Sequence, residues 1–133
     1  MTNNDYGVLL KNAHVAGLAA GNSIVPTPMN LTDGVNNYHV PEGPCGFAWV
    51  VTNEHGNGPF VKYLKNNSGR FKNHSNGSGP SYIHGDKYYY GGYYVTWVGE
   101  FGQSVEKKEA YAEAFCSVLT AAGLKCYAGS RLD

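Results

Sequence analysis

The feature that most constrains the fold is the stretch Tyr88–Asp133, where a strand pattern, a turn, a capped helix and a second strand follow one another. Aromatic and β-branched residues alternate in its first part, which is typical of a half-buried strand. We expect this strand to cover about Tyr88–Val98. The Gly91-Gly92 pair predicts a bulge or a close backbone approach near its start.

A helix follows, and the sequence marks both of its ends. Ser104 is an N-cap residue whose hydroxyl accepts a hydrogen bond from the first turn, and Glu106 places negative charge at the positive end of the helix dipole. Gly123 ends the helix because glycine enters the left-handed C-cap conformation without a Cβ penalty. The apolar stripe of this amphipathic helix consists of Tyr111, Phe115, Val118 and Ala122.

After the helix, Leu124–Ala128 predicts a short returning strand, so that the unit reads β-α-β, with a right-handed crossover if the two strands are parallel in one sheet. The returning chain would bring Gln103, Ser104 and Arg131 together, with Asp133 beside them. Unpaired helix N–H groups near a guanidinium favour a phosphate or a carboxylate. The alternative is that Ser104 only caps the helix and that Arg131 only pairs with Asp133.

Length and charge limit the classes of protein that fit. The chain has 133 residues, which suits one domain over 1–133, and its formal net charge is zero, which removes a global electrostatic argument for nucleic acid. No apolar run is long enough for a membrane span and no signal-peptide pattern is present, so we expect a cytoplasmic protein. Three cysteines without C-x-x-C spacing argue against a disulfide framework and a zinc ribbon. We expect buried thiols, no metal and no cofactor.

The N-terminal part predicts a helix over Tyr6–Ala20 with Asp5 as its cap. One face of this helix is unusually small because it carries Gly17 and Gly21. Such a face lets another backbone come close, and we expect that backbone to belong to the same chain. His14 lies beside this stripe, where we expect a structural role for it.

Between the two helices, the prolines that follow Asn22 exclude a helix and predict an extended segment with turns at Asp33-Gly34 and Glu42-Gly43. The run Cys45–Thr52 predicts a buried strand. A short helix is expected from Pro59 onward, since proline suits the first helical position.

Residues 66–87 are rich in Gly, Ser and Asn and predict a long loop. Taken together, these patterns predict the α+β class. We expect a single domain with a small three- to four-stranded sheet, on which two longer helices and one short helix pack.

Six motifs occur in order along the chain: A-H-V-A-G-L-A-A-G, C-G-F-A-W-V, Y-G-G…W, F-G-Q-S, K-K-E-A-Y-A-E-A-F and Y-A-G-S-R-L-D. Together they resemble a small uncharacterised protein family of tailed bacteriophages. The resemblance covers most of the chain apart from the 66–87 loop, which is expanded here. It implies a viral setting, in the host cytoplasm or in the virion, and it carries no activity with it.

The first function class that fits is a non-enzymatic phage protein acting by protein–protein contacts, as a virion accessory component or an infection-stage factor. Tyrosine is enriched at interfaces because a rigid amphipathic ring supplies contact area at a low entropy cost. We expect self-association or binding to other phage proteins. The candidate interface residues are Tyr88, Tyr89, Tyr90, Tyr93 and Tyr94.

The alternative class is a binder of a nucleotide or of single-stranded nucleic acid. Tyrosine rings can stack on bases while basic side chains contact phosphates. Only Asp86 opposes the cations near the tyrosine row, and the helix N-terminus at Ser104 would add an anion site. The candidate cations are Lys62, Lys65, Arg70, Lys72 and Lys87.

An enzyme is the third class, and the sequence offers no catalytic motif for it. The histidines are scattered, and H-E-x-x-H, G-x-S-x-G and the P-loop are missing from the sequence. Cys45 and His55 make a conceivable nucleophile and base, but a cysteine that opens a hydrophobic strand is usually inert. We therefore expect no catalytic residues.

Overall fold

The computed structural model describes residues 1–32, 34, 37–40, 43–70, 79–80 and 82–133. Within these residues it has the helices α1 (Asn3–Ser23), α2 (Pro59–Asn66) and α3 (Val105–Ala121). The strands are β1 (Met29–Thr32), β2 (Asn37–Val40), β3 (Gly46–Thr52), β4 (Gly69–Arg70), β5 (Tyr82–Ile83), β6 (Tyr93–Trp97) and β7 (Cys126–Leu132). This single small α+β domain confirms the predicted fold class.

The main sheet has the strand order β6-β3-β7, and β3 is antiparallel to both of its neighbours. Strands β6 and β7 are therefore parallel to each other, as a β-α-β unit requires, but β3 lies between them. The central position of β3 follows from its composition, because Ala48, Val50 and Val51 are fully buried and an apolar run of this kind is typical of an interior strand.

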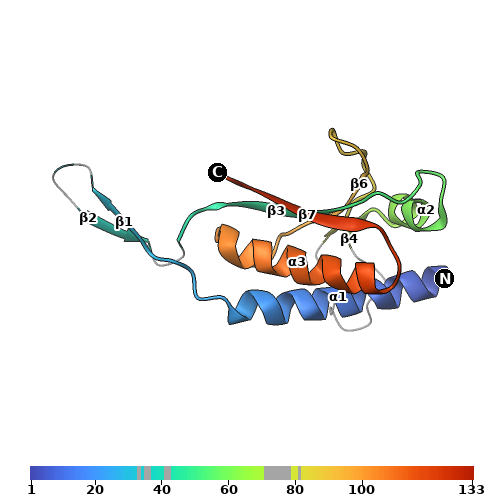
Figure 1. The fold of residues 1–133 in the computed structure, drawn as a ribbon, viewed down its shortest axis with the longest axis horizontal. Coiled ribbons are helices and arrows are strands. Elements are labelled where there is room, and N and C mark those ends of the chain that lie inside the picture. Colours follow the sequence, from blue (N-terminus) through green and yellow to red (C-terminus); the bar gives the residue numbers. More distant parts are fainter. Residues whose placement is uncertain (33, 35–36, 41–42, 71–78, 81) are drawn as a thin grey trace.

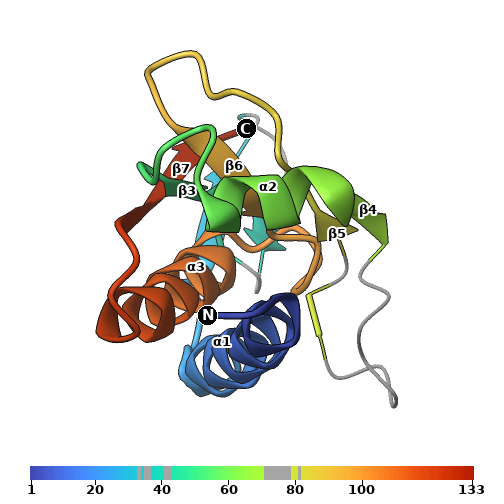
Figure 2. The same cartoon turned by 90° about the vertical axis from the view of Figure 1, so that its right-hand side faces the viewer.

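The two long helices, α1 and α3, lie on one side of this sheet. Figures 1 and 2 show α3 directly against the sheet and α1 against α3, while α2 lies at the end where α1 begins. Phe115 and Leu119 of α3 are fully buried and share the core with Val50 of β3. The core thus fills the space between the sheet and the helix pair.

The small face of α1 packs within the chain, as expected. A Cβ atom built on Gly17 would lie 2.6 Å from the ring of Tyr111 on α3, so this ring occupies the space that a side chain would need. His14 is buried in the same contact, with its Nδ1 atom 2.6 Å from the Tyr111 hydroxyl and 3.6 Å from Glu100 Oε2. The small residues of α1 therefore serve the packing of α1 on α3.

The first helix starts earlier than predicted. Thr2 is its N-cap: the Thr2 hydroxyl accepts from the Asp5 N–H, and the Asp5 carboxylate accepts from the Thr2 N–H. Asp5 therefore completes a capping box instead of capping the helix itself. These hydrogen bonds hold the pKa of the Asp5 carboxyl below its usual value. The helix also runs on to Ser23, beyond the predicted end at Ala20.

Both predicted ends of α3 are confirmed. The Ser104 hydroxyl accepts a hydrogen bond from the Lys107 N–H. At the other end, the backbone turns at Gly123 with a φ of 94°, in the left-handed region that glycine tolerates.

The strand predicted over Tyr88–Val98 is wrong in its first part. Residues 88–92 form a turn, closed by hydrogen bonds from the Tyr88 N–H to the Gly92 carbonyl and from the Gly91 N–H to the Tyr88 carbonyl. Aromatic residues suit a strand, but two adjacent glycines with positive φ end it here. The last strand is longer than predicted and runs to Leu132 instead of Ala128.

Two small hairpins lie outside the main sheet. Strands β1 and β2 pair antiparallel and extend away from the rest of the chain in Figure 1, and β4 pairs with β5 inside the predicted loop. The predicted turns agree at Gly34 and Gly43, which have φ values of 91° and 73°. Asp33 and Glu42 lie outside the described residues.

Candidate binding surface

Side chains alternate across β3, so this strand presents different residues to the two sides of the sheet. Ala48 and Val50 face the helices, whereas Phe47 and Trp49 point to the other side. Tyr94 and Trp97 on β6, and Tyr127 and Arg131 on β7, lie on that same side through the strand register. We call this surface the aromatic face: Phe47, Trp49, Tyr88, Tyr94, Trp97, Tyr127 and Arg131.

The rings of the aromatic face contact one another in a continuous network. Ring centroids lie 5.1 Å apart for Trp49 and Trp97, and 5.0 Å apart for Tyr88 and Tyr94. Phe47 meets Trp97 edge to face at 5.9 Å. Such contacts stabilise by about 0.5–1.5 kcal/mol per pair beyond area burial. The contacts within the network therefore help to hold its rings in place.

Gly129 makes room for this network on β7. It lies opposite Trp49 in the strand register, and the Trp49 indole covers it so closely that a Cβ atom on Gly129 would overlap the ring. Trp49 is only 8% exposed, and its Nε1 atom has no hydrogen-bond partner among the described residues. The indole thus lies flat against the sheet as part of the floor of the aromatic face.

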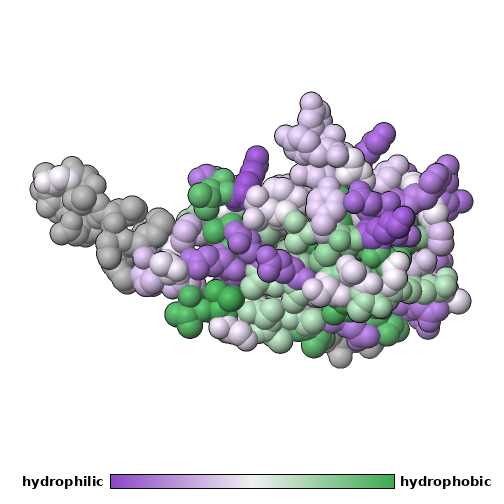
Figure 3. Space-filling model, in the orientation of Figure 1, coloured by the Kyte–Doolittle hydropathy of each residue, from purple (hydrophilic) through white to green (hydrophobic). Residues whose placement is uncertain are grey.

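The Tyr88–Gly92 turn stands above this floor. Figure 1 shows it rising from the sheet next to β6, and the space-filling view in Figure 3 shows the same projection. Tyr89 and Tyr90 lie at its tip and are 90% and 80% exposed, although their rings meet edge to face at 5.0 Å. Between turn and sheet lies a cavity of about 400 Å³, lined by Trp49, Tyr88, Tyr89, Tyr90, Tyr94, Trp97 and Arg131.

Arg131 supplies the positive charge of this cavity. Its guanidinium carbon lies 5.4 Å from the centre of the Phe47 ring, in cation–π contact. Burial raises the pKa of the Tyr94 hydroxyl, and nearby Tyr88 adds to this effect while Arg131 opposes it. No carboxylate pairs with Arg131 within the described part of the chain.

The predicted corner of Gln103, Ser104 and Arg131 is not assembled as a site. The C-terminal chain does return toward the start of α3: Asp133 donates its N–H to the Cys45 carbonyl, and Cys45 forms an isolated β-bridge with Ser104. However, Arg131 points to the aromatic face, because alternation along β7 directs it away from α3.

The helix N-terminus is also occupied by the protein itself. Ser104 is buried with its hydroxyl bound to Lys107 N–H, and the Val105 N–H donates to the Pro44 carbonyl. Gln103 is exposed, and its backbone carbonyl accepts from Gly46 N–H. Glu106 adds a carboxylate that accepts from the backbone and hydroxyl of Thr27. The N-terminal end of α3 therefore makes structural hydrogen bonds within the chain instead of offering its N–H groups to an anion.

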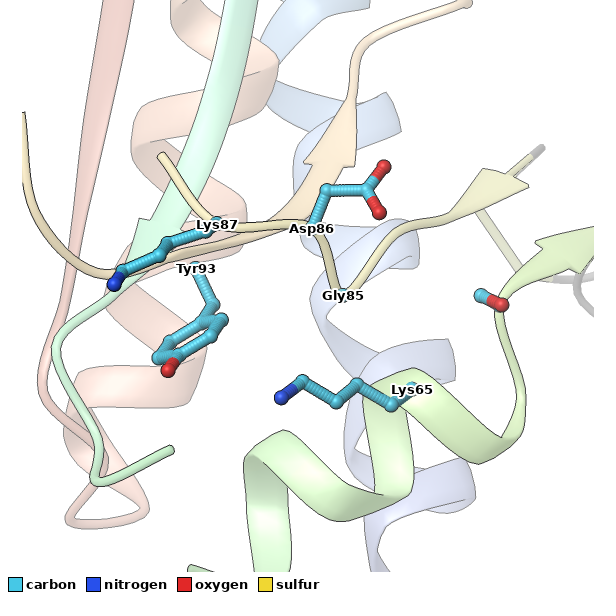
Figure 4. Close-up of a pocket in the computed structure, with 6 residues that line it drawn as sticks. Lys65, Gly85, Asp86, Lys87 and Tyr93 are labelled. Atoms are coloured by element: carbon cyan, nitrogen blue, oxygen red, sulfur yellow. The ribbon is translucent and has the colours of Figure 1, made fainter. Parts of the chain in front are cut away.

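A second hollow, the basic pocket, lies beside β6. It measures about 400 Å³ and is lined by Lys65, Ser68, Gly85, Asp86, Lys87 and Tyr93. Figure 4 shows Lys65 reaching from α2 toward the Tyr93 ring, and its Nζ atom lies 4.9 Å from the ring centre. Lys87 extends from the neighbouring segment, and the Asp86 carboxylate points away from Lys65 in this view.

The structure brings only some of the predicted cations together. Lys65 and Lys87 share the basic pocket, whereas Lys62 is exposed on α2 and does not line it. Arg70 belongs to β4, but its side chain lies outside the described part, as does all of Lys72. Of the five predicted tyrosines, Tyr93 lines the basic pocket and the other four line the aromatic cavity.

The conceivable nucleophile and base are far apart. Cys45 precedes β3 and His55 follows it, and a strand of this length spans about 20 Å. Burial raises the pKa of the Cys126 thiol to about 12, which disfavours the reactive thiolate.

Among the described residues, no cluster of three or more His, Cys, Asp or Glu could hold a metal ion. None of the described helices is long and apolar enough to cross a membrane.

Sequence reasoning missed Phe47, Trp49, Trp97 and Tyr127 as members of the candidate surface. The signal was present in β3, where Phe47 and Trp49 occupy alternate positions and therefore share a face. What the sequence did not reveal is that no helix covers this face in the described structure.

Comparison of the chain with protein-family models, curated proteins and solved structures found no match.

Proposed function

We propose that this chain is a non-enzymatic protein that acts by protein–protein contacts through its aromatic face. The observation that carries the proposal is a cavity of about 400 Å³ whose lining consists of tryptophan, tyrosine and arginine side chains. These three residue types dominate the binding energy of protein interfaces, where they lie near the centre of the contact. The exposed rings of Tyr89 and Tyr90 provide area for a partner.

The charge of the chain fits this class of partner. A formal net charge of zero gives no long-range attraction toward nucleic acid, and Arg131 is the one cation among the described residues that line the aromatic cavity. Arg131 without a carboxylate partner in the described structure favours a protein surface that offers an acidic group. Given the resemblance to a phage family, we propose a virion component or an infection-stage factor as the setting.

A photo-crosslinking residue in place of Tyr89, introduced into the chain in the proposed phage-infected cell, tests this function. We expect it to capture one phage or host protein, whose affinity for the purified chain is then measured. Replacing both tip tyrosines, Tyr89→Ala with Tyr90→Ala, should weaken binding about tenfold or more, as for residues at the centre of an interface. Tyr82→Ala is the matched control, because Tyr82 is an exposed tyrosine outside the aromatic face. Equal binding by all three proteins would refute the proposal.

A second candidate function is binding of a nucleotide or of single-stranded nucleic acid. The observation that favours it is that the aromatic cavity and the basic pocket are neighbours. Lys87 and Tyr93, which line the basic pocket, form the β-bridge at the base of the turn whose tyrosines line the aromatic cavity. Bases stacked on Tyr88 and Tyr94 would leave phosphates free for Arg131 or the lysines.

Fluorescence anisotropy with a labelled single-stranded oligonucleotide tests this candidate. We expect affinity to fall steeply with added salt, and the salt slope to drop by about one for each of Lys65→Ala and Lys87→Ala. Lys11→Ala, on α1, serves as the control. No binding at low salt would exclude nucleic acid and leave the protein partner.

A further inference from the structure

The two edge strands of the main sheet, β6 and β7, differ in the hydrogen bonding of their outer edges. The outer edge of β6 is covered, because the His84 N–H donates to the Val95 carbonyl and the Tyr94 N–H donates to the Asp86 carbonyl. The outer edge of β7 has no strand beside it in the described structure. One edge of the sheet is therefore closed by the chain itself and the other is open.

The open edge presents a regular row of backbone groups. In an antiparallel pair, alternate residues direct both their N–H and C=O groups to the partner strand. The hydrogen bonds of Lys125 with Asn53 and of Asp133 with Cys45, at the two ends of β3, show that the odd-numbered residues do so here. The even-numbered residues therefore direct their groups outward, and no described residue bonds to them: Cys126, Ala128, Ser130 and Leu132.

Among the residues that the structure describes, none protects the outer edge of strand β7 in the usual way. Natural proteins protect such edges with proline, bulges, lysine or a covering element. Strand β7 pairs with β3 without a shift from Cys126 to Leu132, contains no proline, and has Arg131 as its only charged residue. A seven-residue edge of this kind is a template for an added strand.

The sequence of β7 is complementary to itself when two copies run antiparallel about Gly129. Each residue then faces the one at the same distance on the other side of Gly129. Lys125 faces Asp133 of the second copy, and Tyr127 faces Arg131, so a charge pair and a cation–π pair form at each end. The remaining pairs carry no charge: Cys126 with Leu132, and Ala128 with Ser130.

We propose that two copies of this chain pair through β7 around a two-fold axis at Gly129. The pairing joins two three-stranded sheets into one of six strands. Because facing residues share a side of the sheet, both aromatic faces lie on the same side. The dimer therefore presents two aromatic cavities to a single partner surface. This inference does not depend on the function proposed for the aromatic face.

One feature of the same region opposes the pairing. Glu109 and Glu113 on α3 line a hollow of about 110 Å³ beside Ala128, Gly129 and Ser130. A two-fold axis at Gly129 would bring the carboxylates of both copies to one place below the sheet, where like charges repel. Removing the charge of Glu113, which is exposed, should tighten the dimer.

Sedimentation velocity over a range of protein concentrations tests the pairing. We expect the wild type to dimerise, Glu113→Gln to dimerise more tightly, and Ser130→Pro to be monomeric, because proline removes an outward N–H and obstructs the added strand. The Ser130 N–H makes no contact with β3, so the fold should persist, as circular dichroism will show. A monomeric wild type at every concentration, together with a monomeric Glu113→Gln variant, would overturn the proposal.

A charge exchange identifies the register. Lys125→Glu places two acidic residues opposite each other and should weaken dimerisation about three- to tenfold, as expected for exposed charge pairs. Asp133→Lys should do the same through two basic residues. The double variant restores opposite charges and should regain wild-type affinity. A dimer that both single changes leave intact, or that the double variant does not restore, would show that another surface forms it.

Discussion

The two sides of the main sheet use the same strands for different purposes. On the helix side, Ala48 and Val50 are fully buried against Phe115 and the rest of the core. On the aromatic face, Phe47 and Trp97 remain partly exposed although they are larger side chains than Ala48 and Val50. Because the core cluster lies on the helix side, we expect that side to contribute more to the stability of the fold than the aromatic face does.

The strongest test of this contrast is Phe115→Ala on the helix side. Phe115 is completely buried in the core cluster, and its loss leaves a cavity. We expect the free energy of unfolding to fall by about 3–5 kcal/mol, measured by urea denaturation. Trp97→Ala on the aromatic face is the comparison and should cost clearly less. An equal or larger cost for Trp97→Ala would remove the contrast.

Gly129→Ala probes the aromatic face itself. The added methyl group overlaps the Trp49 ring, so either the indole or β7 must shift. We expect a loss of about 1–3 kcal/mol and a change in tryptophan fluorescence of the folded protein. Ser130→Ala is the control, because it changes a residue of the same strand without the overlap with Trp49. Another glycine, Gly102, would be a poor control, because its positive φ makes alanine unfavourable there. A fluorescence spectrum unchanged by Gly129→Ala would contradict the packing described.

Alkaline pH should weaken the helix side through Cys126. Burial raises the pKa of its thiol from 9.0 to about 12, so the folded chain keeps a proton that the unfolded chain loses. The free energy of unfolding should thus be unaffected below about pH 9 and fall as the pH rises toward 12. Urea denaturation at several pH values measures this slope. Cys126→Ala should reduce it, and an unchanged slope would assign the effect to the buried tyrosines instead.

The smallest effect on stability is expected at the tip of the turn. Tyr89 is 90% exposed, so Tyr89→Ala should change the free energy of unfolding by less than about 0.5 kcal/mol. The same substitution should reduce binding to a partner of the aromatic face. A large loss of stability would mean that the turn belongs to the core of the fold rather than to its binding surface.

Several local features could be predicted because their causes lie within a few residues. The cap at Ser104, the stop at Gly123 and the proline start of α2 all depend on hydrogen bonds or backbone angles of a single turn. The early residues of α1 were missed because Thr2 and Asp5 form a capping box, in which the cap is the first residue and not the acidic one.

The candidate site was predicted only in part, and its membership depended on longer-range order. The tyrosine row was recognised, yet Tyr93 and Tyr94 point to different pockets because neighbours in a strand face opposite sides. Arg131 was expected beside Ser104, whereas a shift of one position along β7 would be needed to turn its side chain to the side of α3. The register of a strand with β3 decides which of its side chains face each side of the sheet, and local sequence patterns do not encode this register.

By itself, the sequence determined the positions of the three helices and of strand β3 in this protein, through caps, glycines and apolar periodicity, and it determined the small face with which α1 meets α3. The tertiary structure alone decided that β3 separates β6 from β7, that the rings of three strands meet on one side of the sheet, and that no described strand lies beside the outer edge of β7. The physical reason is range: a cap is made by neighbours in the chain, whereas a strand acquires its partners and its faces from residues far away in the sequence.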